Sequence, residues 1–303
     1  MALLRNRHKG QFVACSCFSL GYNSNGLAHH DLIEGIRLLA EIGYRGVAIT
    51  LDQGALNPFS ERTPAQLDVV SELLKQKNLR CVIETGGRFL LNPHVKHEPT
   101  LVSADPDGRA RRVEFLCRAI DIAHQLGAEC VSLWSGVVHD TADEHDAFSR
   151  LIGGLASVLD YANSKGVVLA FEPEPGMLVD TLDRYADLLE ELAKNRIDSS
   201  RLLLTIDVGH LHCLGEVPVA DRIRKWADRL ANVHIEDMRQ GVHEHLMFGE
   251  GEIDFPPVFA ALRQIRYSGL VSVELSRHSH EAPTAARRAY NYLRPLIDAA
   301  ADE

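Results

Sequence analysis

Four side chains that commonly bind metal ions each follow a short apolar run in the second half of this 303-residue chain. They are Glu172, Asp207, His234 and Glu274. The runs are rich in β-branched residues, as in strands that are buried on both faces. Three carboxylates and one imidazole form a suitable ligand set for a divalent cation. Because these residues recur at the same edge of a repeating strand–helix pattern, the sequence predicts that they form one site.

The directions of the side chains support this convergence, because residues alternate between the two faces of a strand. Glu172 follows Phe171, and Asp207 follows Ile206. The apolar member of each pair suits contact with helices, so the polar member is predicted to point into the space that the strands enclose. Carboxylates brought together in such a place repel one another unless a cation compensates them. An oxygen-rich set with one imidazole suits Mn²⁺, Mg²⁺ or Co²⁺ and does not exclude Zn²⁺.

The elements that must position these side chains alternate between strand and helix. Predicted strands are Phe12–Cys17, Gly46–Leu51, Arg80–Glu84, Cys130–Trp134, Val167–Glu172, Leu202–Asp207, Leu230–His234 and Leu270–Glu274. Predicted helices are Asp31–Ile42, Pro64–Lys77, Arg111–Leu126, Glu144–Lys165, Thr181–Asn195, Val219–Arg229, Pro256–Gln264 and Ala282–Ala299. This pattern predicts an α/β fold, a (β/α)₈ TIM barrel in a single domain over residues 1–303. A doubly wound open sheet is the alternative, but no glycine-rich dinucleotide fingerprint follows the first predicted strand.

Two long connections follow predicted strands and would therefore lie on the catalytic face of a barrel. The first runs from Gly86 to about Arg109, and the second runs from Met238 to about Phe255. Connections of this length are usually lids or binding loops. We expect both to border the site, and the first to order over it when substrate binds.

Composition restricts the possible classes of function. A net charge of −10 and a pI near 5.8 argue against a surface for nucleic acid or anionic lipid. The chain has no apolar run long enough to span a membrane and no secretory signal at its start. The six cysteines are spread as reduced core thiols, and Cys15 and Cys17 fit neither a redox pair nor a zinc knuckle. These features predict a cytoplasmic protein with a small-molecule substrate and no nucleic-acid or membrane partner.

Several segments resemble the xylose-isomerase-like barrel superfamily, in the branch of the sugar phosphate isomerases and epimerases. The resemblance covers nearly the whole chain and is strongest at Glu172-Pro173, Asp207-Val208-Gly209-His210, His234-Ile235-Glu236-Asp237, the stretch 245–255 and Val273-Glu274. It implies that the four predicted ligands hold one divalent metal, often manganese. It also implies that Glu172 and Glu274 exchange a substrate proton from opposite sides of a sugar carbon, and that His210 contacts substrate. Members of this branch are often dimers or tetramers, so a homo-oligomer is expected.

Other residues near predicted strand ends are candidate substrate contacts: Glu84, Arg88, Trp134, Glu174, Glu236, Arg239 and His245. Glu84 is expected either to bind a substrate hydroxyl or to pair with Arg88. Trp134 is expected either to form an apolar wall for a sugar ring or to fill the barrel. Glu174 faces the same way as Glu172, so it either orients a metal ligand or forms an ion pair at the rim.

The remaining candidates lie after the seventh predicted strand. Glu236 stands where many members of the resembled family carry Lys, which removes a positive charge near the site. Arg239 follows closely and could restore that charge. His245 immediately precedes the segment that contains Gly249-Glu250-Gly251, which in the resembled family helps to shape the site.

These observations predict a metal-dependent isomerase or epimerase that acts on a sugar, a sugar phosphate or a related polyol or keto compound, with proton transfer between Glu172 and Glu274. A metal-dependent lyase that dehydrates a keto-inositol or a dehydroshikimate-like acid is an alternative with the same metal and the same proton abstraction. A DNA-repair endonuclease on this barrel would need several metals and a basic face, which the net charge of −10 disfavours. A non-catalytic barrel is disfavoured by the intact ligand set.

Overall fold

The computed structural model describes residues 18–299. Parallel strands form a closed barrel in the order β1-β10-β7-β6-β5-β4-β3-β2. The barrel strands are β1 (Ser19–Asn23), β2 (Gly46–Thr50), β3 (Arg80–Glu84), β4 (Val131–Leu133), β5 (Leu169–Phe171), β6 (Leu202–Asp207), β7 (Leu230–Ile235) and β10 (Leu270–Val273). Because the sheet closes on itself, the predicted (β/α)₈ barrel is confirmed and the doubly wound open sheet is excluded.

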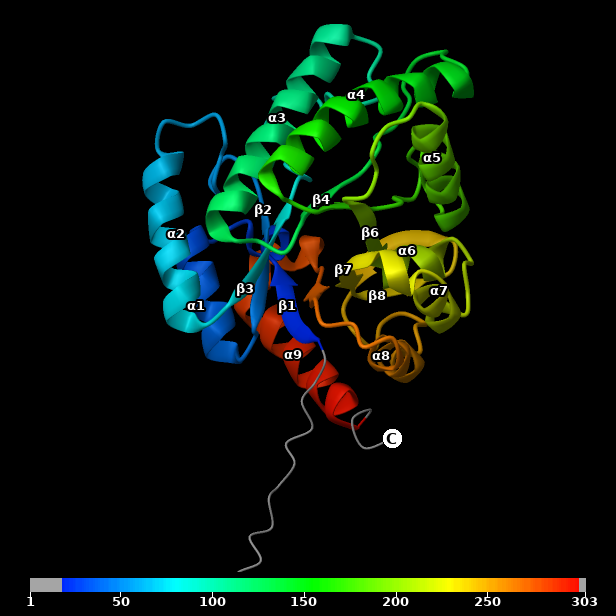
Figure 1. Cartoon of the computed structure of the whole chain (residues 1–303). Coiled ribbons are helices and arrows are strands. Elements are labelled where there is room, and N and C mark those ends of the chain that lie inside the picture. The colour runs from blue at the N-terminus through cyan, green and yellow to red at the C-terminus, as the bar shows by residue number, and fades with distance from the viewer. Residues whose placement is uncertain (1–17, 300–303) are drawn as a thin grey trace, which may run out of the picture.

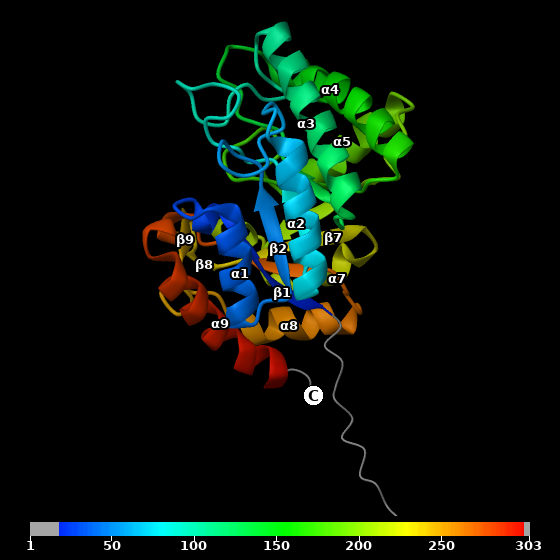
Figure 2. The same ribbon diagram turned by 90° about the vertical axis from the view of Figure 1, so that its left-hand side faces the viewer.

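Helices surround the barrel, with α1, α2 and α3 covering one flank and α3 and α4 packed against each other (Figures 1 and 2). The helices are α1 (Leu32–Ile42), α2 (Thr63–Lys77), α3 (Pro106–Leu126), α4 (Glu144–Lys165), α5 (Leu182–Lys194), α6 (Val208–Cys213), α7 (Val219–Lys225), α8 (Phe255–Gln264) and α9 (Ala282–Ala299). Helix α3 begins before the predicted Arg111 because the Asp105 carboxylate accepts hydrogen bonds from the N–H groups of Asp107 and Gly108.

The first strand of the barrel differs from the prediction. The predicted strand Phe12–Cys17 lies outside the described residues, whereas β1 begins at Ser19 and pairs with both β10 and β2. The prediction missed β1 because Gly21 and Asn23 are poor strand formers by composition. Gly21 is required by close packing, since a Cβ atom at this position would lie 2.9 Å from the Ser272 Oγ atom.

The inside of the barrel changes from apolar to polar along each strand. A small buried cluster fills one level of the interior and consists of Ala48, Val82, Cys130, Ala170 and Leu270. The next inward position of β3 is Glu84, and the next after Ala170 of β5 is Glu172. Because inward positions are two residues apart, a single strand supplies both a core residue and a site residue. The predicted alternation of polar and apolar side chains is therefore confirmed in these strands.

The connection predicted as a loop over 238–255 instead contains an antiparallel hairpin of β8 (Asp237–Arg239) and β9 (Val242–Leu246). The buried Asp237 carboxylate fixes this segment, because it accepts hydrogen bonds from the N–H groups of Met238, Gly249, Gly251 and Ile253. Short 3₁₀ helices η1 (Ser24–Leu27), η2 (Ala227–Arg229) and η3 (Ser276–Glu281) complete the described elements. Sequence periodicity missed the hairpin because charged and polar residues alternate with few apolar ones there.

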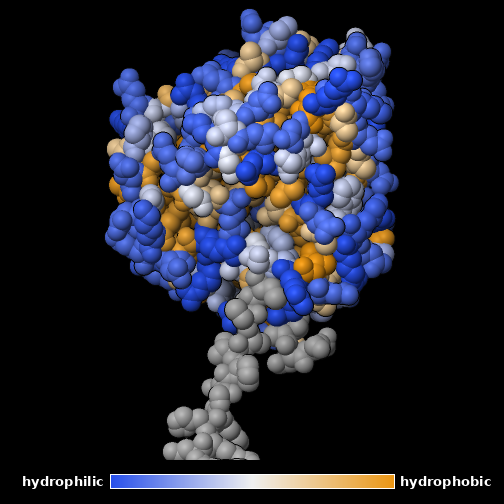
Figure 3. All heavy atoms as spheres, in the orientation of Figure 1, coloured by the Kyte–Doolittle hydropathy of each residue, from blue (hydrophilic) through white to orange (hydrophobic). Residues whose placement is uncertain are grey.

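Polar side chains cover most of the face of the molecule drawn in Figure 3, and apolar side chains show between them. Among residues 18–299, no helix combines the length and the apolar character that crossing a membrane requires. Cys81, Cys117, Cys130 and Cys213 are free thiols, as predicted, while Cys15 and Cys17 lie outside the described residues.

Candidate active site and metal centre

The four predicted metal ligands meet at the carboxyl ends of the barrel strands. Strand pairing places Asp207 of β6 directly beside His234 of β7, and Glu274 follows the end of β10, the strand next to β7. Glu172 follows the end of β5 on the other side of β6. One possible ligand atom from each of the four residues lies within 4.8 Å of the others. The barrel register therefore produces the cluster that the strand ends predicted.

His234 lies at the centre of this cluster and contacts carboxylates through both ring nitrogens. Its Nε2 atom is 2.9 Å from the Glu84 Oε1 atom. Its Nδ1 atom is 3.0 Å from the Glu172 Oε1 atom and 3.1 Å from the Glu274 Oε2 atom. If the Nε2–H group donates to Glu84, the Nδ1 atom is left as the nitrogen that can bind a cation. This pairing of a carboxylate with the outer nitrogen of a ligand histidine is usual in metal sites.

The charges at the site show why it favours a cation. Burial alone would lower the pKa of His234, but Glu84, Glu172 and Glu274 outweigh burial and hold this pKa well above its usual range. Burial raises the pKa of Glu172 to about 7. Burial opposes ionisation of Glu274 as well, but the neighbouring His234 prevails and holds the pKa of Glu274 below its usual range. A divalent ion would take over the compensating role of the His234 proton.

The residues present fit a divalent metal ion. Three carboxylates and one imidazole are the donors, and each of the four side chains is buried or nearly so. The Asp207 Oδ2 atom is buried and has no hydrogen-bond partner. A buried carboxylate oxygen without a partner is costly in a protein interior. A cation at this position would remove that cost.

A cavity of about 500 Å³ lies above the cluster, a size that accommodates a small ligand. Glu172, His234 and Glu274 form part of its lining. Trp134 forms another part and is fixed from behind, because the buried Arg112 guanidinium lies 4.4 Å from the centre of its ring. The cavity therefore combines carboxylate and imidazole groups of the cluster with one aromatic side chain, that of Trp134.

The family model of the xylose isomerase-like TIM barrel matches residues 36–296 of this sequence. The chain belongs to that family. L-ribulose-5-phosphate 3-epimerase UlaE of Shigella flexneri serotype 5b is 25% identical over 256 residues, which cover 84% of this chain and 85% of UlaE.

Solved structures of family members have the same fold. D-allulose 3-epimerase from Methylomonas sp. superposes with a TM-score of 0.72 at 21% identity, over 92% of this chain and 98% of that protein. The 3-keto-D-glucoside 4-epimerase YcjR from E. coli superposes with a TM-score of 0.73 at 17% identity, over 92% of this chain and 99% of YcjR. Homologues and structural neighbours of this family member thus include sugar epimerases.

Five of the predicted substrate contacts line the cavity: Glu84, Arg88, Trp134, Glu174 and His245. Glu84 does not pair with Arg88, since its carboxylate contacts His234 and also accepts a hydrogen bond from the Asn232 Nδ2 group at 3.3 Å. The Arg88 guanidinium instead donates to the backbone oxygen of Asn25 at 2.9 Å. Glu84 is therefore held beside His234 and not beside Arg88.

The other three predicted contacts, His210, Glu236 and Arg239, are not among the residues that line the cavity. Glu236 is fully buried and lies against Gly209. The approach is close enough to require glycine, since a Cβ atom on residue 209 would lie 1.9 Å from the Glu236 Oε1 atom. Burial and the neighbouring Asp207 raise the pKa of Glu236 well above its usual range. Arg239 is exposed and donates to the backbone oxygen of Glu250. Its side chain therefore does not bring positive charge into the cavity.

Sequence reasoning missed two residues that contact the predicted ligands. The Asn25 Nδ2 group donates to the Glu274 Oε1 atom at 2.7 Å, and Asn232 lies beside both Glu84 and His234. Asn25 was missed because the predicted first strand ends at Cys17, whereas β1 ends at Asn23, two residues before Asn25. Asn232 stands two residues before His234 and could have been found from the same alternation that selected His234.

We expect changes at Glu84 to weaken metal binding in two steps. Glu84→Gln keeps an oxygen that can accept from His234 but removes its charge, so metal affinity should fall about tenfold. Glu84→Ala also frees the imidazole to rotate, and affinity should fall about 100-fold, the upper range for residues that support metal ligands. Titration of the metal-free variants with Mn²⁺ measures both effects. The exposed Glu114→Gln serves as a control, and unchanged affinity in Glu84→Ala would contradict the orienting role.

Proposed function

We propose that this protein is a divalent-metal-dependent sugar epimerase that inverts a carbon next to a ketone group. The observation that carries this proposal is the convergence of Glu172, Asp207, His234 and Glu274. All of them except Asp207 line a cavity of about 500 Å³. The sugar epimerases among its relatives support the same reaction class. Manganese is the proposed ion, with Mg²⁺, Co²⁺ or Zn²⁺ as substitutes that the same donors accept.

The four residues would hold the ion, and when bound it polarises a substrate carbonyl and makes the adjacent C–H bond acidic. Glu172 and Glu274 supply the proton chemistry. Their carboxylates reach the centre of the site from β5 and from β10, with β6 and β7 between them. One carboxylate removes the proton and the other returns a proton to the opposite face of the carbon, which inverts its configuration. The hydrogen bond from Asn25 favours the ionised form of Glu274.

The lining of the cavity favours a ketose that carries a phosphate group. Arg88, Lys96 and Arg277 all line the cavity and bring positive charge to it, and Arg277 also pairs with Glu244 at 2.8 Å. Glu236 does not line it, so the loss of the family Lys at that position does not bring a negative charge to the substrate. The name of the relative UlaE, an L-ribulose-5-phosphate 3-epimerase, supports a phosphorylated ketose as the first substrate to test.

Solvent isotope incorporation tests the proposed reaction. The Mn²⁺-loaded protein is incubated in deuterated water with ketoses and ketose phosphates, and the products are analysed by mass and by NMR. We expect an epimer of unchanged heavy-atom composition that carries solvent deuterium at the inverted carbon. An epimer without deuterium would contradict proton transfer that exchanges with solvent, and a product that has lost water would identify the lyase alternative.

A further inference from the structure

A buried arginine lies behind the aromatic side chain of the cavity. Arg112 is on helix α3, and only 1% of its surface is exposed. Its Nη2 atom donates a hydrogen bond to the backbone oxygen of Thr85 at 3.1 Å. Its Nε atom is buried and has no hydrogen-bond partner, and within residues 18–299 the guanidinium forms no ion pair. A buried charge with so few polar partners is unusual and requires a reason.

Two aromatic rings surround this charge in place of a carboxylate. The Arg112 Cζ atom lies 4.4 Å from the centre of the Trp134 ring and 5.0 Å from the centre of the Phe115 ring. Ring faces attract cations, and more strongly where water is excluded. Burial lowers the pKa of Arg112 to about 9, and Glu98 opposes this shift, so the group is a cation at neutral pH. One of the two rings that hold it, Trp134, lines the cavity.

Packing alone does not explain an arginine at this position. An apolar side chain of similar length would fill the space without the cost of desolvating a charge, and such replacements are often neutral or stabilising. What the guanidinium adds is a flat cation on the ring of Trp134 and a donor for the backbone of Thr85. Thr85 directly follows Glu84, which contacts His234. Arg112 therefore joins the Trp134 ring to the end of β3.

Trp134 also contacts the long connection that follows β3. The ring centres of His97 and Trp134 lie 5.6 Å apart, with the rings nearly perpendicular. The His97 N–H group donates to the backbone oxygen of Arg88 at 2.6 Å. His97 and Arg88 line the cavity together with Trp134. The indole is therefore held between a buried cation and cavity-lining residues, and a shift of the ring would disturb that side of the cavity.

We propose that Arg112 is a positioning residue for substrate binding, which holds the Trp134 ring so that it packs against the C–H groups of a sugar. The proposal rests on the proposed function, because the sugar comes from it. Arg112 is not among the residues that line the cavity, so it acts through Trp134 and not by contact with substrate. A ring that contacts substrate away from the reacting carbon binds the ground state and the transition state alike. Its loss raises KM and leaves kcat nearly unchanged.

Kinetics of the Mn²⁺-loaded protein with L-ribulose 5-phosphate test the effect on binding. Arg112→Met keeps the length of the side chain and removes the guanidinium. We expect KM to rise about tenfold, within the range of one buried cation–π contact. We expect kcat to stay within about threefold of the wild type. The midpoint of thermal unfolding should not fall, because a buried charge has been removed. Arg118→Met is the matched control and should behave as the wild type, because Arg118 also lies on α3 and over a ring, that of Phe59, but is exposed.

Fluorescence tests the positioning itself without a substrate. The chain has two tryptophans, so Trp226→Phe leaves Trp134 as the only indole. In that background, the anisotropy decay of Trp134 should show rotation with the whole protein only. Arg112→Met should add a fast local rotation of the ring, and Arg118→Met should not. Arg112→Lys guards against loss of the fold and should show an intermediate amplitude, because it keeps the charge but not the planar contact.

The two measurements separate failure of this inference from failure of the proposed function. Unchanged anisotropy decay in both Arg112→Met and Arg112→Lys overturns the positioning role, whether or not the protein turns over the sugar phosphate. Faster ring motion with an unchanged KM overturns the link to substrate binding. Faster ring motion in a protein whose wild type inverts no ketose or ketose phosphate supports the positioning of Trp134 and contradicts the proposed epimerase.

Discussion

Replacing either Glu172 or Glu274 by Gln is expected to lower kcat by about 100-fold or more, the usual scale of general acid–base catalysis. Gln keeps an oxygen near the metal but cannot accept the substrate proton. The two carboxylates come from the ends of β5 and β10, with β6 and β7 between them. We therefore expect them to act on opposite faces of the substrate carbon, so that neither replaces the other. Metal content should fall less in these variants than in Asp207→Asn.

The two variants should differ in which epimer exchanges its proton with solvent. If Glu172 serves one epimer and Glu274 the other, each variant should still exchange the proton of a different epimer in deuterated water. The exposed Glu114→Gln provides the matched control and should behave as the wild type. Near-normal turnover in both Glu172→Gln and Glu274→Gln on an identified substrate would refute the two-glutamate mechanism, whatever the metal content.

Removing a ligand from the four-residue set is expected to lower affinity for the catalytic ion by more than about 100-fold, beyond the effect of changes to supporting residues. His234→Ala removes the central imidazole, and Asp207→Asn removes the charge of a carboxylate whose Oδ2 atom has no other partner. The barrel should survive Asp207→Asn, because Asn can also cap α6 in place of the Asp207 Oδ1 atom that accepts from the His210 N–H group.

Titration with Mn²⁺ measures this loss, and circular dichroism checks that the variants remain folded. Mn²⁺ is chosen because the oxygen-rich set favours it. Variants that are folded and bind Mn²⁺ with wild-type affinity would remove this set as the metal centre.

Much of the barrel and the four-residue set could be predicted from sequence, because both depend on local patterns and one topological rule. Alternation placed Glu172 above Ala170 on the inward face of one strand, and parallel barrel strands present their carboxyl ends at the same edge. The first strand was the exception, since an apolar segment outside the described residues had a stronger strand pattern than Ser19–Asn23.

The contacts around that set depended on the tertiary structure. Glu84 was chosen as a site residue from its strand, but its contact with His234 arises only when β3 and β7 face each other across the closed barrel. The position of Glu236 also could not be predicted from the sequence, because its side chain lies against Gly209 and does not line the cavity. Side-chain direction is a local property of a strand, whereas the partner that a side chain meets depends on barrel closure and on the packing of distant segments.

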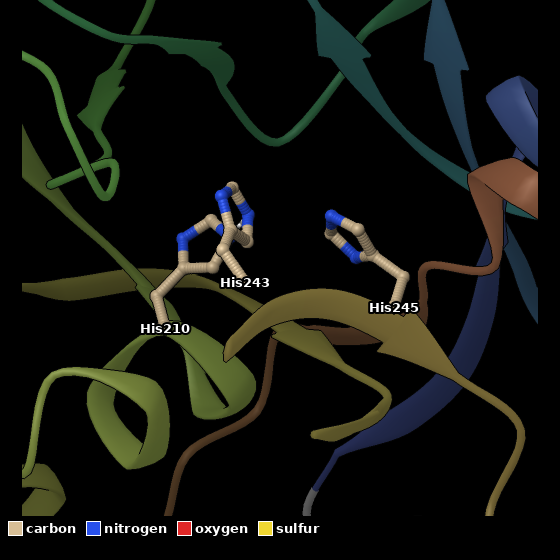
Figure 4. Close-up of side chains that lie close together, drawn as sticks. All are labelled: His210, His243 and His245. Carbon is tan, nitrogen blue, oxygen red and sulfur yellow. Dashed lines mark hydrogen bonds between the residues drawn. The ribbon is translucent and has the colours of Figure 1, made fainter. Parts of the chain in front are cut away.

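The cluster of His210, His243 and His245 shows the same limit most clearly, because one ring nitrogen from each lies within 4.8 Å of the others (Figure 4). His245 was selected for its place before a glycine-containing segment and His210 for its place after Asp207, while His243 was not selected. Their meeting depends on the hairpin of β8 and β9, which polar alternation did not reveal and which Asp237 fixes through backbone hydrogen bonds. The sequence by itself determined seven of the eight barrel strands, their inward faces and the four residues that meet at their carboxyl ends. Only the tertiary structure decided which other side chains contact these four residues. Those contacts join segments that are far apart along the chain, and no periodic sequence pattern predicts which distant segments pack together.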